Sequence, residues 1–102
     1  MSYVTNVMIS GLFYESDNVK SILDNYSEIN GCKVGGTKCL ECDLFIGAFN
    51  YIDPLKLINQ LADIEKIVEP YEWENTQVFI KNDNDDIWYV HLASEITESD
   101  IR

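Results

Sequence analysis

Polar and apolar residues alternate over the first ten positions of the chain, which is the period of a β-strand. Residues 3–10 are therefore predicted to form a strand. The apolar spacing then changes to intervals of three and four residues, which is typical of one face of a helix. This helix is expected to begin at Ser16 or Asp17 and to end at Asn30-Gly31. The apolar positions that define it are Val19, Ile22, Leu23 and Tyr26.

A glycine pair separates the next two predicted strands. Gly35-Gly36 is a turn signal between a short strand over 32–34 and a longer one over 38–49. Because side chains alternate along a strand, the longer one has an apolar face and a mixed face. The apolar face consists of Leu40, Cys42, Leu44, Ile46 and Ala48, and the mixed face of Cys39, Glu41, Asp43, Phe45, Gly47 and Phe49.

The dipeptide Asp53-Pro54 predicts a helix start, because aspartate caps free backbone N–H groups and proline fits the first helical position. Apolar residues then recur at helical spacing, and the helix is expected to end before Pro70. Two strand-like segments follow, over 76–81 and 87–92, joined as a hairpin by a polar loop. Residues 94–102 are expected to form a frayed tail or a short final helix.

This order of elements predicts an α+β fold in a single domain that spans residues 1–102. The expected architecture is an antiparallel or mixed sheet with two helices on one face. The preferred topology is ferredoxin-like, βαββαβ, with an extra C-terminal strand. A hydrophobic fraction of 46% with 12% aromatic residues is typical of a packed core and not of a disordered acidic chain.

The composition disfavours several classes of protein. No apolar run approaches the ~20 residues of a membrane span, and the first residues lack the charged start of a signal peptide. Three cysteines are an odd count, and reduced thiols in a cytoplasmic protein are the simplest interpretation. Seven Lys and Arg against eighteen Asp and Glu argue against direct nucleic-acid binding, because phosphate contacts require basic groups.

The candidate metal and catalytic motifs are weak. Cys39 and Cys42 have the spacing of a zinc knuckle, and Cys32 and His91 would complete four ligands. Residues three apart on a strand face opposite sides, so small buried thiols are the preferred interpretation. The loop 82–86 has no register that fits an EF-hand, and the glycine pair lacks the spacing of a phosphate-binding loop. No catalytic residue, metal site or cofactor is therefore predicted.

The formal charge of −11 exceeds the ~2–8 that suffices for a soluble small domain. The charge is also uneven, because residues 69–102 carry nine acids and two bases. A basic partner is therefore expected to bind near the carboxyl end, with the aromatic residues among these acids as anchors. The predicted partner-binding residues are Glu69, Tyr71, Glu72, Trp73, Glu74, Asp83, Asp85, Asp86 and Trp88.

In size and charge the chain is similar to small acidic inhibitors such as toxin-immunity proteins and phage anti-defence proteins. This similarity is compositional and transfers no site residues. The leading hypothesis is a non-enzymatic cytoplasmic inhibitor that occludes a basic partner, such as a nuclease toxin or another nucleic-acid enzyme. The rival interpretation assigns the aromatic residues to the core and the acids to a merely solvated surface. Whether the protein is a monomer or a homodimer is left open.

Two other hypotheses concern the middle of the chain. A small-molecule-binding module would use a pocket beside the sheet near Gly47. The aromatic lining of that pocket would be Phe45, Phe49 and Tyr51. An enzyme would instead need acid–base groups. The candidates for that role are Glu41, Asp43 and His91.

Overall fold

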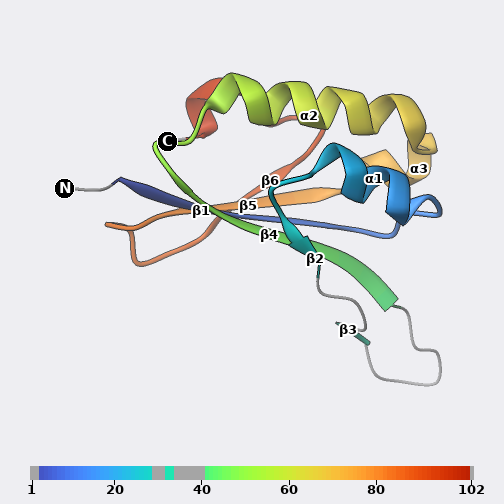
Figure 1. Ribbon diagram of the computed structural model, residues 1–102, viewed down its shortest axis with the longest axis horizontal. Helices are drawn as coiled ribbons and strands as arrows, with labels where there is room; N and C mark the ends of the chain where they lie inside the picture. Colours follow the sequence, from blue (N-terminus) through green and yellow to red (C-terminus); the bar gives the residue numbers. More distant parts are fainter. Residues whose placement is uncertain (1–2, 29–31, 34–40, 102) are drawn as a thin grey trace.

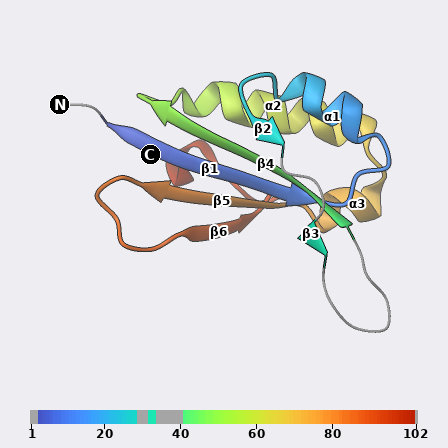
Figure 2. The same cartoon turned by 60° about the horizontal axis from the view of Figure 1, so that its bottom comes forward.

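The computed structural model describes residues 3–28, 32–33 and 41–101, which form an α+β fold. Its strands pair antiparallel in the order β2-β4-β1-β5-β6, and β3 also pairs with β4 (Figure 1, Figure 2). The strands are β1 (Val4–Gly11), β2 (Ser27–Glu28), β3 (Cys32–Lys33), β4 (Glu41–Asn50), β5 (Gln77–Asn82) and β6 (Tyr89–Leu92). The helices are α1 (Ser16–Ile22), α2 (Pro54–Ile67), α3 (Pro70–Glu74) and the 3₁₀ turn η1 (Glu98–Asp100).

The core lies between the sheet and the long helix α2, which runs along the sheet with α1 beside it (Figure 1). The alternation predicted for the first strand is confirmed, because every second residue of β1 is buried. Thr5, Val7 and Ile9 have no exposed surface. Each apolar side chain removed from water in this way stabilises the fold by about 1.5–3 kcal/mol. The helix residues packed in the same cluster include Leu57, Leu61 and Ile64.

The strand β4 turns its mixed face to the core. Phe45 is fully buried, whereas Leu44 and Ile46 on the opposite side are only half-buried. The cause is the register with β1, which places Phe45 opposite Ile9 and Gly47 opposite Val7. Directly opposed residues of paired strands share a face, so β4 has to bury the side that matches the buried side of β1.

The first helix is shorter than its apolar spacing predicts. α1 ends at Ile22, because Leu23 leaves the helical conformation with ψ of 61° while its N–H still bonds the Val19 carbonyl. The turn formers Asp24 and Asn25 follow. Leu23 and Tyr26 are nevertheless buried, so the apolar pattern marks residues that pack in the core after the helix has ended. The expected end at Asn30-Gly31 lies outside the described residues.

The N-terminal caps of the helices differ in how well the sequence predicted them. Asp53 caps α2 as expected, since its carboxylate accepts the N–H groups of Leu55 and Lys56 at 3.1 and 3.4 Å. At α1 the N-cap is Glu15 and not Ser16 or Asp17, and its side chain makes no capping bond. The helix α3, which begins at Pro70, was not predicted.

The C-terminal segment is anchored and contains a short helical turn, so of the two expected alternatives it matches the short final helix and not the frayed tail. Ile96 is buried and Ile101 has no exposed surface, so the chain after β6 returns to the core. Between them lies η1, which contacts α2. The predicted hairpin of β5 and β6 is present. Across the described ranges, no helix combines the length and apolarity that crossing a membrane requires.

Candidate functional site

The predicted partner-binding residues fall into two groups at opposite ends of β5. One group lies in and around α3, just before the strand, and the other follows the strand in the β5–β6 turn. β5 has six residues, which corresponds to a length of about 20 Å. Figure 2 shows α3 and the β5–β6 turn at opposite ends of the sheet. The two groups therefore do not form one continuous acidic surface.

Glu72 belongs to the internal structure of the α3 end. Its side chain is buried, and one carboxylate oxygen accepts the N–H of Glu69 at 2.9 Å. The other oxygen accepts the N–H of Tyr14 at 2.7 Å, which fixes α3 to the loop after β1. A carboxylate occupied in this way is not available to a partner. The prediction that Glu72 faces a partner is therefore corrected.

Trp73 does not face a partner either, because the residue is only 8% exposed and belongs to the core cluster. The helix α3 turns Trp73 inward on one face and leaves Tyr71 exposed on another. Glu69 and Glu74 are exposed as well. Three of the predicted residues at this end thus reach solvent, and two of them are acids.

The β5–β6 turn presents its acids from a fixed backbone. The N–H of Asp83 donates to the Val4 carbonyl at 2.9 Å, which ties the turn to β1. The side chain of Asn82 also holds the turn. Its oxygen accepts a hydrogen bond from the Thr5 hydroxyl, and its amide group donates to the Asp85 carboxylate at 3.5 Å. Asp83 and Asp86 are exposed, and Trp88 next to them is 39% exposed. This end therefore combines accessible acids with an accessible aromatic side chain.

The chain end adds further acids to the same region. A hollow of about 310 Å³ is lined by Asp85 from the turn, Tyr89 and His91 from β6, and Ser99 and Asp100 from η1. We use the name acidic edge for this region. It is defined by the turn residues Asp83, Asp85 and Asp86 and the η1 residues Glu98 and Asp100. The predicted partner-binding residues did not include the η1 acids, although the charge count of the last third did.

Within the acidic edge, Asp100 caps η1 and also lies close to His91. Its carboxylate accepts the N–H and the hydroxyl of Thr97, at 2.9 and 3.1 Å, and so caps η1. These hydrogen bonds, with a smaller contribution from His91, hold the pKa of Asp100 below its usual value. The His91 Nδ1 atom lies 4.0 Å from the carboxylate, and the Nε2 atom is buried with no hydrogen-bond partner among the described residues.

Two of the candidate acid–base residues, Asp43 and His91, lie far apart. Asp43 is on β4 and His91 is on β6, with β1 and β5 between these strands. Three strand spacings correspond to about 14 Å, which is beyond a shared proton. Asp43 accepts the N–H of Phe13 at 3.2 Å and so has a structural role. The side chain of Glu41 lies outside the described part.

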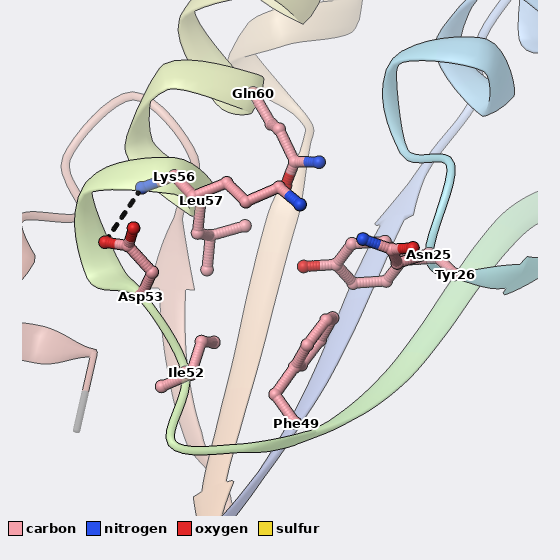
Figure 3. A pocket seen from close by; sticks show the side chains of 8 residues that line it. All are labelled: Asn25, Tyr26, Phe49, Ile52, Asp53, Lys56, Leu57 and Gln60. Atoms are coloured by element: carbon pink, nitrogen blue, oxygen red, sulfur yellow. Dashed lines mark hydrogen bonds between the residues drawn. The ribbon is translucent and has the colours of Figure 1, made fainter.

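The region near Gly47 is filled by side chains and leaves little room for a ligand. The rings of Tyr26 and Phe49 contact each other with centroids 5.1 Å apart, and a Cβ on Gly47 would meet both. Figure 3 shows these two rings facing Leu57 and Gln60 of α2. Burial raises the pKa of the Tyr26 hydroxyl far above its usual value of 10.

The remaining cavity at this position measures about 70 Å³. Pockets for small molecules usually measure about 300–1,000 Å³, so this cavity is too small for a metabolite. Phe49 lines it, but Phe45 is buried in the core and Tyr51 is exposed. The three aromatic residues therefore do not form the common lining that the small-molecule hypothesis expects.

The cysteines were considered as metal ligands in the sequence. Cys42 is a half-buried free thiol on β4, and the β3–β4 register places Cys32 opposite it. Cys39 and Gly35-Gly36 lie outside the described residues. Within the part of the chain that the structure describes, no group of three or more His, Cys, Asp and Glu side chains is arranged to hold a metal ion.

Comparisons with known proteins add no functional information. No protein family, curated protein or solved structure was found to match this chain. The assignment of function therefore depends on the geometry and charge described above.

Proposed function

We propose that this protein is a non-enzymatic inhibitor that docks its acidic edge onto a basic partner and occludes the partner's working surface. The observation that carries the proposal is the composition of the chain from 82 to 101, which has six carboxylates and no Lys or Arg. Five of these carboxylates belong to the turn and to η1, on either side of β6. Trp88 and Tyr89, which are 39% and 49% exposed, lie between them and supply aromatic anchors.

The partner class follows from the charge. Enzymes that act on nucleic acids carry positive grooves, because the phosphate backbone dominates such binding. A nuclease toxin or another nucleic-acid enzyme is therefore the partner that the acidic edge fits best. A cytoplasmic location belongs to the same proposal, and the free thiol of Cys42 is consistent with a reducing compartment.

We also propose that the fold is ferredoxin-like with β6 as an additional strand. The support is the strand order β2-β4-β1-β5, with α1 following β1 and α2 following β4 along the chain. The contact between α1 and α2 supports the expected placement of both helices on one face. Fold alone does not specify function, so the inhibitor proposal is tested separately.

The test begins with capture of a partner by the tagged protein from its host at low salt. We expect a basic protein that is released at high salt, because salt screens the attraction between exposed charges. The purified partner is then used for kinetics. The variant carries Asp83→Asn, Asp86→Asn and Glu98→Gln, which are all exposed positions. We expect its association rate at low salt to fall by about tenfold or more.

A matched control changes the net charge by the same amount elsewhere. It carries Glu15→Gln, Asp24→Asn and Glu65→Gln, which are exposed on or beside the two helices. We expect the control variant to associate with the partner nearly as fast as wild type does. We also expect the wild-type protein to block the partner's activity on nucleic acid. Equal rates for both variants, or a partner that stays fully active in the complex, would contradict the proposal.

A further inference from the structure

The side of the sheet opposite α2 is not covered by any described helix (Figure 1, Figure 2). Antiparallel sheets that face water normally carry polar side chains on that side. This side instead carries an apolar row across four strands. The register places Ile46 of β4 opposite Met8 of β1, Met8 opposite Phe79 of β5, and Phe79 opposite Val90 of β6. We call this side of the sheet the open face.

A second row extends the apolar surface of the open face. Leu44 of β4 and Leu92 of β6 lie at its two ends, with Ser10 and Gln77 between them. The exposed fraction is 55% for Val90 and 38% for Leu92. Of the remaining residues in the two rows, Gln77 is exposed and the others are half-buried. Exposing this apolar surface to water costs free energy, and a second protein layer packed on it would remove that cost.

The open face also lacks the acids that dominate the rest of the chain. Among the described positions of β1, β4, β5 and β6 that point to this side, Lys81 is the one charged residue. The chain has eighteen Asp and Glu, and none of them occupies such a position. A basic partner would find no carboxylate to pair with on the described strands of this face, so the open face and the acidic edge favour different partners.

We propose that the open face is a homodimer interface, in which the sheets of two copies pack against each other. Two chains that each carry a charge of −11 repel each other over most of their surfaces. The open face is the approach that keeps the carboxylates of the two copies apart. Packed antiparallel sheets lie about 10 Å apart with interdigitated apolar side chains, which suits the row from Ile46 to Val90.

The size of the open face indicates how strong this dimer is. Strands about 4.8 Å apart, each rising about 3.3 Å per residue, give the four-stranded part an area of about 500 Å² per copy. Two such faces reach about 1,000 Å² in total, which is near the lower limit for a specific interface. Interfaces near this limit are weak or transient, so we expect a weak dimer that forms at high protein concentration. Added salt is expected to strengthen it, because salt screens the repulsion between the two copies.

The experiment is sedimentation velocity of the whole chain, from low micromolar to near-millimolar concentration, at low and high salt. The test variant is Val90→Lys and the control is Tyr89→Lys. These neighbours on β6 are similarly exposed, at 55% and 49%, but they point to opposite sides of the sheet. Both changes make the net charge less negative, so a general charge effect would favour association in both variants.

We expect Val90→Lys to weaken the dimer by about tenfold or more, because it places a charge in an apolar interface. Tyr89→Lys is expected to dimerise like wild type. A second test at the centre of the row, Met8→Lys, should abolish the dimer, and circular dichroism checks that this variant is folded. A wild-type protein that stays monomeric at the highest concentration and salt would overturn the proposal. Equal weakening by both β6 variants would indicate pairing through the strand edge and would overturn it as well.

Discussion

The Glu72 carboxylate accepts the Tyr14 backbone N–H at 2.7 Å and so joins two segments that are 58 residues apart in the chain. Its other oxygen accepts the Glu69 N–H at the start of the same short helix. One buried acid thereby caps α3 and holds α3 against the loop between β1 and α1. The residue that sequence reasoning assigned to a partner is therefore part of the framework that supports the sheet.

Substitution of Glu72 by alanine is expected to destabilise the protein by about 2–3 kcal/mol. The reason is that two backbone N–H groups lose a charged acceptor in a buried place. Urea unfolding measures the change. Glu74→Ala, an exposed change in the same helix, is the control and should stay within about 0.5 kcal/mol of wild type. Similar losses in both variants would contradict the assignment of the loss to the two hydrogen bonds of Glu72.

Substitution of Gly47 by alanine is expected to destabilise the protein by about 1–3 kcal/mol through overpacking. A Cβ at this position would lie 2.5 Å from the Phe49 ring and 3.0 Å from the Tyr26 ring. Thermal unfolding measures the cost. The matched test repeats the substitution in a Phe49→Leu background, where the nearest ring is gone and the cost should shrink. An unchanged cost in that background would assign the effect to the backbone and not to the ring contact.

Asp100 predicts a pH dependence of the C-terminal turn. The Thr97 N–H and hydroxyl, and to a smaller extent His91, lower the pKa of Asp100 from 3.8 in the folded state. A carboxyl group with a lowered folded-state pKa stabilises the fold above its unfolded pKa and loses that effect as the pH falls through the folded value. We therefore expect η1 to loosen only under acid conditions below about pH 4.

An NMR titration of the Asp100 carboxyl carbon checks this expectation. The variant Thr97→Val removes the hydroxyl donor and keeps the backbone donor, so the Asp100 pKa should rise part of the way toward its usual value. Asp100→Asn should remove the acid-induced loosening of η1, as followed by the amide signals of Glu98 and Ile101. A titration of Asp100 at its usual value in the wild-type protein would contradict the proposed cap.

Local signals predicted the elements that depend on neighbours in the chain. Asp53-Pro54 predicted the start of α2 because a cap and a proline act within one helical turn. The alternation over residues 3–10 predicted β1 and the division of its side chains between two faces. The acidic turn after β5 was also predicted, since turn formers and charges are visible in the sequence itself. These interactions span only a few residues, so the sequence shows them directly.

Only the tertiary structure decided which face of β4 is buried and where the acids lie in space. The register with β1 made Phe45 a core residue and left the more apolar Leu44 and Ile46 on the open face. The chain itself determined an excess of carboxylates in its last third, but the length of β5 divided them between two ends of the sheet. It is contacts between distant segments, such as Glu72 with Tyr14, that decide whether an acid supports the fold or faces a partner.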